Sequence, residues 1–541
     1  MRAALLPLVL LVGASAPPAL STAPLFAGMG TYDRTVASPS APAQRYFQQG
    51  MMLAWGFNAA EAARSFEAAA DADPSCALCY WALAWSQGPN INSDMDAGAA
   101  QRVQGALERA RALARDASPR NRALINALSA RHPAAGSGPT LDEEAYAVRM
   151  RALSNTYPRD ADIATLAAEA VMNLHPYDWW DPRGAPRPWT LEASTLLARA
   201  LQVAPRHPGA NHYWIHLVEP SPHPEVGLAS ADRLTKLVPG SGHLLHMPAH
   251  IYMRVGRYAD AVAASQRAIA ADKRYLEQVD AQGAYRVGYV AHNAHFLWAA
   301  AAMAGRSAEA LAAARAAFPA ACGPRPADRS TGILQHYYVL PLYARVRFGR
   351  WREILEDTLP PDVSEPYLLA IWHYARGTAY AKTGRVAAAR RELGLVERLG
   401  VDPQLERARI KNINPAHSLV RIAALTLNAD IAIAERRPAD AIAPLEQAVT
   451  LEDALTYDEP HLWLAPTRHA LGAALLAANR PADAERIYRE DLTRYPDNGW
   501  SLIGLATAQQ RQGNADGARA TGERFRAAWQ NADIALTASR F

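Results

Sequence analysis

Residues 484–518 read AERIYREDLTRYPDNGWSLIGLATAQQRQGNADGA, and this stretch decides the fold. Its apolar side chains recur every three or four residues, which is typical of helices with one buried face. Ala484 and Ala518 occupy equivalent places 34 residues apart, so the stretch is one full repeat. Its opening spacing, Ala484-Tyr488-Asp491-Pro496, is found twice more, as Ala62-Phe66-Ala69-Pro74 and Ala193-Leu197-Ala200-Pro205. The sequence therefore predicts an array of short helices connected by turns.

A second marker of the repeat is a Gly or Asn followed by Arg at the turn between two helices. It occurs at Gly256-Arg257, Gly305-Arg306, Gly349-Arg350, Gly384-Arg385 and Asn479-Arg480. Runs that alternate apolar and polar residues, as strands do, are absent. In spacing and residue pattern, residues 45–530 resemble the tetratricopeptide repeat (TPR), a helix–turn–helix unit. The resemblance implies an all-α fold, a right-handed α-solenoid of antiparallel helix pairs.

The turn markers at 256, 305 and 349 are 49 and 44 residues apart, so longer helices or inserted loops interrupt the repeat. Segments rich in Pro and Gly indicate insertions at 132–140, 175–189, 219–225 and 323–332. The segment 175–189 has three tryptophans, and it either packs back on the helices or forms a lid over the groove. We expect a signal peptide at 1–23, an extended segment at 24–44, a TPR-like array at 45–455 with a histidine-rich core at 161–350, and C-terminal TPR units at 456–541.

Eight of the sixteen histidines share one stripe of four consecutive predicted helices, because they lie three, four or seven residues apart within each helix. They are His212, His216, His243, His246, His250, His292, His295 and His336. In TPR proteins the second, fifth, ninth and twelfth residues of a unit's first helix face the concave groove, and the resemblance places all eight histidines at such positions. Burying so many polar rings without a partner is costly, so we expect a functional pocket. The loop histidines at 132, 175, 207, 223 and 417 are expected to be solvated.

Imidazole is the commonest protein ligand of transition metals, and two histidines one helical turn apart can converge on one ion. With the eight histidines, Glu219 is a candidate ligand, while Glu169, Tyr285 and Tyr289 are possible further pocket residues. Cysteine is absent from this face, which disfavours a closed zinc–thiolate site. Nitrogen and oxygen donors suit Zn, Cu, Fe or Ni alike. The sequence therefore predicts a transition-metal site in the concave pocket.

Three functions fit such a pocket. The first is metal-assisted chemistry on a small molecule or peptide, and the second is a scaffold that grips a protein or peptide partner without catalysis. The third is a metal carrier or sensor. The fold favours the scaffold, whereas the composition of the site favours a metal. We prefer the metal-site hypothesis and leave open whether the protein is an enzyme. The net charge of only +4 gives no case for nucleic acid. Neither the substrate nor the oligomeric state follows from the sequence.

The first residues, MRAALLPLVLLVGASAPPALSTAP, are typical of an export signal, with Arg2, an apolar run from Leu5 to Val12 and small residues after it. This run is shorter than the roughly 20 residues that span a bilayer, and no later run is expected to do so. We therefore expect a bacterial protein that is periplasmic or secreted. In such an oxidising compartment Cys76 and Cys79 either form a local disulfide or pack as two small apolar residues at a helix start.

Several longer stretches also resemble a group of exported bacterial TPR proteins of unclear function. They are Asn211–Tyr258, the HNAHFL motif at 292–297, Asp73–Asn92 and Asn498–Leu505. This resemblance supports the fold and the export, and it implies no reaction.

Overall fold

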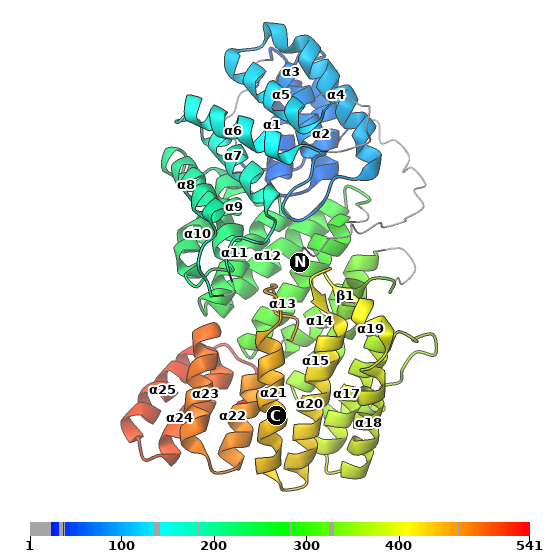
Figure 1. The fold of residues 1–541 in the computed structure, drawn as a ribbon, viewed down its shortest axis with the longest axis vertical. Helices are drawn as coiled ribbons and strands as arrows, with labels where there is room; N and C mark the ends of the chain where they lie inside the picture. Colours follow the sequence, from blue (N-terminus) through cyan, green and yellow to red (C-terminus); the bar gives the residue numbers. More distant parts are fainter. Residues whose placement is uncertain are drawn as a thin grey trace. The chain divides into compact units, whose positions relative to one another are not determined.

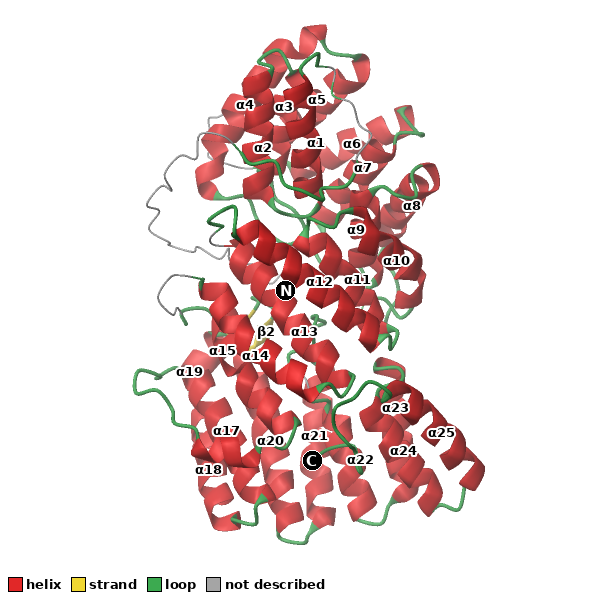
Figure 2. Cartoon of the chain, turned by 180° about the vertical axis from the view of Figure 1, so that it is seen from behind, coloured by secondary structure: helices red, strands yellow, loops and turns green. Residues whose placement is uncertain are grey.

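The computed structural model describes residues 23–31, 36, 38–133, 141–181, 183–281, 284–323, 329–463 and 465–541. Regular structure in these ranges is almost entirely helical (Figure 1, Figure 2), so the predicted all-α class is confirmed. The exception is a small antiparallel hairpin of β1 (Arg409–Ile410) and β2 (Asn414–Pro415). The chain forms two compact units, residues 1–248 with 271–279 and residues 249–270 with 280–541. The predicted signal peptide lies outside the described residues, apart from Ala23.

In the first unit each helix packs on the next one along the chain. Its helices are α1 (Ala41–Trp55), α2 (Ala59–Ala72), α3 (Ala77–Ser86), α4 (Ala100–Leu113), α5 (Pro119–Arg131), α6 (Glu143–Thr156), α7 (Ala161–Leu174), α8 (Pro188–Val203), α9 (Pro208–Val218) and α10 (Leu228–Leu237). Three 3₁₀ turns connect them, η1 (Ala97–Ala99), η2 (Ala114–Asp116) and η3 (Pro224–Gly227). Helices α11 (Gly242–Arg254) and α12 (Tyr258–Leu276) contain residues of both units.

The second unit continues the pattern of neighbouring helices packed in sequence order. It contains the π turn η4 (Arg286–Val290), the 3₁₀ turn η5 (Pro438–Ala441), and the helices α13 (Ala291–Met303), α14 (Ser307–Cys322), α15 (Gly332–Arg347), α16 (Trp351–Glu356), α17 (Pro366–Lys382), α18 (Val386–Leu399), α19 (Pro403–Arg407), α20 (Ala416–Ala434), α21 (Ile442–Asp453), α22 (Thr467–Ala477), α23 (Pro481–Arg494), α24 (Gly499–Arg511) and α25 (Ala515–Ala528).

The turns predicted from the Gly-Arg and Asn-Arg markers share one geometry. The four marker glycines have φ between 64° and 79°, and Asn479 has φ 58°. In each turn the N–H of the following residue donates to the carbonyl five residues earlier, as Arg257 does to Tyr252 at 2.8 Å. This bond closes a helix end through a left-handed residue, a conformation that Gly adopts without steric cost. Repeated helix pairs with the same turn confirm the TPR-like architecture.

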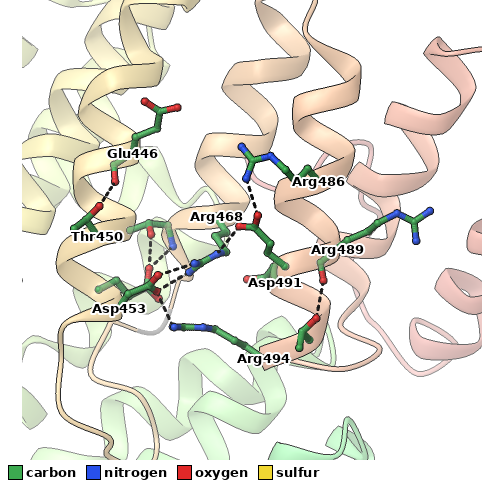
Figure 3. Close-up of polar contacts among 12 residues, drawn as sticks. Glu446, Thr450, Asp453, Arg468, Arg486, Arg489, Asp491 and Arg494 are labelled. Carbon is green, nitrogen blue, oxygen red and sulfur yellow. Dashed lines mark hydrogen bonds and ion pairs between the residues drawn. The ribbon is translucent and has the colours of Figure 1, made fainter. Parts of the chain in front are cut away.

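Ion pairs connect the helices near the C-terminus (Figure 3). Arg468 of α22 donates to both carboxylate oxygens of Asp453 on α21, at 2.7 Å each, and Arg494 of α23 lies 2.7 Å from the same carboxylate. The indole N–H of Trp500 on α24 donates to the carbonyl of Ala302 on α13 at 2.9 Å. Residues 456–541, predicted as C-terminal TPR units, are thus part of the second unit.

Helix α20 has the length and composition of a membrane-spanning helix, with a mean hydropathy of 1.2 over its most apolar window. However, 61% of that window is buried, against α17, α18 and α21 among others. Asp430 of the same helix is buried and pairs with Arg540 and Lys382, at 2.9 and 3.3 Å. This burial and pairing are those of a core helix.

The insertion at 175–189 packs back on the helices rather than standing free. Trp179 is 1% exposed, and the indole N–H of Trp180 donates to the carbonyl of Leu217 on α9 at 2.7 Å. At the start of α3, Cys76 and Cys79 are joined by a disulfide, which decides between the two alternatives for this pair. Residues 134–140 and 324–328 of two other predicted insertions lie outside the described residues.

Candidate metal centre

Three buried histidines of the first unit come together where α9 meets the start of α11. His212 and His216 lie one turn apart on α9, and His243 is at the beginning of α11. Their exposed fractions are 0%, 2% and 2%, and one ring nitrogen of each lies within 4.8 Å of the others. The Nε2 atoms of His212 and His243 are 3.0 Å apart. Two nitrogens bound to one tetrahedral ion at about 2.0–2.1 Å would lie roughly 3.3 Å apart, so this pair needs little movement to chelate an ion.

The opposite ring nitrogens of His212 and His216 are oriented by hydrogen bonds. Nδ1 of His212 lies 2.6 Å from the carbonyl oxygen of Trp55, and Nδ1 of His216 lies 3.2 Å from Oε1 of Glu219. Because a carbonyl only accepts, Nδ1 of His212 carries a proton, which makes Nε2 the lone-pair nitrogen of the neutral ring. A carboxylate on Nδ1 of His216 has the same effect on that ring. Hydrogen bonds of this kind orient the imidazole ligands of metal sites.

An aromatic wall encloses the three imidazoles. The ring centroid of Phe57 lies 4.5, 5.9 and 5.5 Å from those of His212, His216 and His243. Tyr177 of the insertion contacts His216 from another side, at 6.3 Å. Phe57 and Tyr177 are also the aromatic residues with positive φ, 56° and 57°, among the described residues. Strained backbone of this kind persists where the surrounding structure requires it, often at functional sites.

Close packing of α9 on α1 brings this site together. A Cβ atom on Gly209 would lie 2.5 Å from the Trp55 ring, so only glycine allows the approach that lets Trp55 reach His212. His207 caps α9, because its Nδ1 accepts from the N–H of Ala210 at 3.0 Å, while its Nε2 lies 3.1 Å from Asp162. His207 is 5% exposed and His132 is 4% exposed, so the prediction that these two loop histidines are solvated was wrong.

The two predicted carboxylates have different surroundings. Glu219 is buried and contacts Nδ1 of His216, so in this structure it orients a ligand ring. Glu169 of α7 lies in a separate pocket, where the indole N–H of Trp85 approaches its two oxygens at 3.1 and 3.3 Å. Burial raises the pKa of Glu169 to about 7, against the opposing charge of Arg131. Glu169 is therefore a proton-exchanging group near neutral pH.

In the second unit, His250 of α11 and His292 of α13 face each other with ring centroids 5.8 Å apart. Both rings also pack on Phe296, at 4.5 and 5.2 Å. His246 lies one turn before His250 on α11, and it is fully buried. Tyr285 and Tyr289, the possible further pocket residues, pack against each other at the π turn η4, with tilted rings whose centroids are 5.5 Å apart.

His295 and His336 form another pair in the second unit, with ring centroids 5.3 Å apart and no exposed surface. His336 Nδ1 lies 2.9 Å from the hydroxyl of Tyr367, whereas neither nitrogen of His295 has a hydrogen-bond partner. Burial, with the charge of Lys411, lowers the pKa of His336 to about 3. Burial, with the neighbouring imidazole of His336 and the charge of Lys411, lowers the pKa of His295 well below its usual value. Both imidazoles are therefore neutral, the form that binds metals.

Three contributors were not predicted from the sequence, namely Trp55, Phe57 and Tyr177. Only Phe57 left a signal. The turn after α1 repeats the geometry of the marker turns, because the N–H of Asn58 donates to the carbonyl of Leu53 at 2.9 Å, yet Phe occupies the place of Gly or Asn. Arg436 occupies the same place in another turn but is exposed, whereas Phe57 is 5% exposed, so its buried ring indicates a role for the side chain.

Similarity to known proteins gives no information about what this site binds. No family model matches the chain, and no curated protein matches it. Among solved structures it is similar to the human IFIT1 dimer with m7Gppp-AAAA, at 11% identity over 91% of this chain and 90% of that one, with a TM-score of 0.30. It is also similar to the TPR domain of P58(IPK), at 14% identity over 90% of this chain and 93% of that one, with a TM-score of 0.20. The assignment of helix pairs therefore rests on this chain's own turns.

Proposed function

We propose that this protein binds a transition-metal ion at His212, His216 and His243 on a TPR-like scaffold. The observation that supports the proposal is the convergence of three buried imidazoles, two of them oriented through Nδ1 by Trp55 and Glu219. One ring nitrogen of each histidine lies within 4.8 Å of the others, so one metal ion can bind all three rings. Three neutral nitrogens suit Zn, Cu, Fe or Ni.

A three-histidine centre leaves a coordination position open to water or a substrate, the arrangement of catalytic rather than structural zinc sites. A metal ion held by the three histidines would lower the pKa of a coordinated water and so supply a nucleophile near neutral pH. The proposal therefore includes metal-assisted chemistry on a small molecule, with carriage or sensing of the metal as the alternative. Burial of the three rings disfavours a peptide-binding role for them, because a bound peptide contacts side chains that line an open groove.

We also propose that the protein is exported to the periplasm or the medium of a bacterium. The N-terminal sequence supports this location, and so does the disulfide between Cys76 and Cys79, since such bonds persist in oxidising compartments. Fractionation of natively expressed protein, with its intact mass, tests the proposal. Cytosolic protein that retains residues 1–23 would contradict it.

The metal proposal is tested by elemental analysis of protein purified without added metal, followed by chelator dialysis and titration with Zn²⁺ or Cu²⁺. We expect stoichiometric metal in the native chain and its loss in H212A/H216A/H243A, with the helical circular dichroism retained. His223 is the matched control, because it pairs with Glu225 at the same 3.2 Å as His216 with Glu219 but is exposed. H223A should bind as the native chain does. Absence of metal at every pH, or unchanged binding in the triple variant, overturns the proposal. If a second ion binds at His250 and His292, H250A/H292A should lower the metal content of the chain.

A further inference from the structure

The second unit contains a pair of histidines that is separate from the proposed metal centre. His295 of α13 and His336 of α15 have no exposed surface, and their ring centroids lie 5.3 Å apart. Both ring nitrogens of His295 and Nε2 of His336 are buried, and none of the three has a hydrogen-bond partner among the described residues. Buried polar atoms without partners destabilise a fold and are rare in native proteins. Three of them on two adjacent rings therefore indicate a ligand that both rings share.

Aromatic neighbours hold the two rings in place. The hydroxyl of Tyr367 on α17 lies 2.9 Å from Nδ1 of His336, so Nε2 is the nitrogen of this ring that remains for a ligand. Tyr337 packs against His295 in a T-shaped contact, with centroids 5.7 Å apart, and its own hydroxyl donates to the carbonyl of Val287 at 3.2 Å. An ion would therefore meet rings that are already positioned, as the imidazoles of metal sites usually are.

The charges around the pair distinguish one class of metal ion from another. Among the described residues, no Asp, Glu, Cys or further His joins the two rings in a group that could hold a metal ion. Lys411, in the turn of the β1–β2 hairpin, donates to Oδ1 of Asp458 at 2.7 Å and to the carbonyl of Glu459 at 2.8 Å. Besides burial, the charge of Lys411 lowers the pKa of both imidazoles, so it acts on the pair. The donors are thus two neutral nitrogens with a cation nearby.

Two neutral nitrogen donors favour a monovalent ion over a divalent one. The cost of taking an ion out of water grows with the square of its charge, and the repulsion from Lys411 grows in proportion to that charge. Divalent zinc also takes four ligands as a rule, whereas imidazole suits copper and the filled d shell of Cu⁺ allows coordination by two donors. An ion about 2.0 Å from one nitrogen of each ring would place the centroids roughly 5–6 Å apart, depending on the angle at the ion. The observed 5.3 Å lies in that range.

We propose that His295 and His336 bind one monovalent copper ion, through Nε2 of His336 and one nitrogen of His295. This site goes beyond the proposed metal centre, because it shares no ligand with His212, His216 and His243. Coordination gives partners to buried nitrogens on both rings, so the ion should stabilise the fold. Full burial of both ligands suits retention of the ion rather than catalysis on a substrate.

The site is tested in the full chain with H212A/H216A/H243A, so that the first metal centre does not contribute. Chelator-dialysed protein is titrated anaerobically with Cu⁺ against a chromophoric Cu⁺ chelator. Adding H295L should weaken the binding of one Cu⁺ by more than about 100-fold, the upper end of the loss caused by removing only an orienting group. H336L should have the same effect. Zn²⁺ bound by the same chain should be unaffected by either change.

His373 provides the control, because it lies on α17 with Tyr367 but pairs with Glu392, at 2.6 Å. H373L should bind Cu⁺ as its parent chain does. Unchanged Cu⁺ affinity in folded H295L overturns the site, whatever the first metal centre binds, and loss of Zn²⁺ together with Cu⁺ overturns the choice of a monovalent ion. If H295L does not fold, X-ray absorption of the parent chain with one Cu⁺ decides. Coordination by two nitrogens supports the proposal, and three or more ligands overturn it.

Discussion

The ring centroids of Phe57 and His212 lie 4.5 Å apart, although Phe57 has a left-handed backbone with φ 56°. Most equivalent turns among the described residues have Gly at this place, as at Gly256 and Gly305, and the others have Asn479 and the exposed Arg436. A left-handed conformation costs a residue with a Cβ atom roughly 1–2 kcal/mol. The contact with three imidazoles is therefore made at a cost in stability, which is the pattern expected of a residue selected for the site.

Two substitutions at Phe57 separate the effect of its left-handed backbone from the effect of its aromatic ring. Both F57G and F57A lose the ring, but only F57G also relieves the left-handed strain. We expect F57G to be more stable than F57A by about 1–2 kcal/mol, measured by thermal or denaturant unfolding. Both variants should bind metal more weakly than the native chain and to a similar degree. Equal stability of the two variants would remove the strain argument, and unchanged metal affinity would show that the ring does not position the histidines.

Glu219 is expected to act through His216. Loss of a group that orients a metal-binding imidazole weakens metal affinity by about 10- to 100-fold. E219A should therefore lower the affinity measured by competition with a chromophoric chelator, and E219Q, which can still accept a hydrogen bond, should lower it less. E225A removes the matched carboxylate on exposed His223 and should have no effect. If E219A and E219Q lose all metal equally, Glu219 is itself a ligand.

His295 should reduce the stability of the metal-free chain. Both its ring nitrogens are buried without a hydrogen-bond partner, and such a group costs about 1–3 kcal/mol. H295L is therefore expected to raise the midpoint of thermal unfolding after chelator dialysis. H207L is the contrasting variant, because His207 is equally buried but bonds to Asp162 and Ala210, and its midpoint should fall. A similar fall in both variants would refute the assignment of His295 as an unsatisfied group.

The raised pKa of Glu169 predicts a pH dependence of stability. Between its usual value of 4.5 and about 7, the folded chain holds a proton that the unfolded chain releases. The contribution of this proton to stability is therefore fully present below pH 4.5 and is lost as the pH rises through 7. The unfolding midpoint of the native chain, minus that of E169Q, should fall between pH 5 and 8. A flat difference over this range would show that Glu169 is ionised throughout.

The sequence by itself determined the helix pairs, their turns and the histidine stripe. These features depend on residues a few positions apart, such as Gly256 before Arg257 or His212 and His216 one turn apart on α9. Helical periodicity and left-handed backbone preferences are local, so they can be predicted from the sequence without knowing which helices pack together. The same rules could not assign roles to loop residues, and His207 was for that reason expected in solvent.

The tertiary structure alone decided which histidines meet and what surrounds them. Trp55 reaches His212 across 157 positions of sequence, and Trp85 reaches Glu169 across 84. No periodicity relates such residues, because their contact depends on how α1 and α3 pack on α9 and α7. Packing also turned Glu219 towards Nδ1 of His216 and placed Glu169 in a pocket of its own. The helix stripe supplied the candidate ligands, and only close packing between distant helices oriented their ring nitrogens.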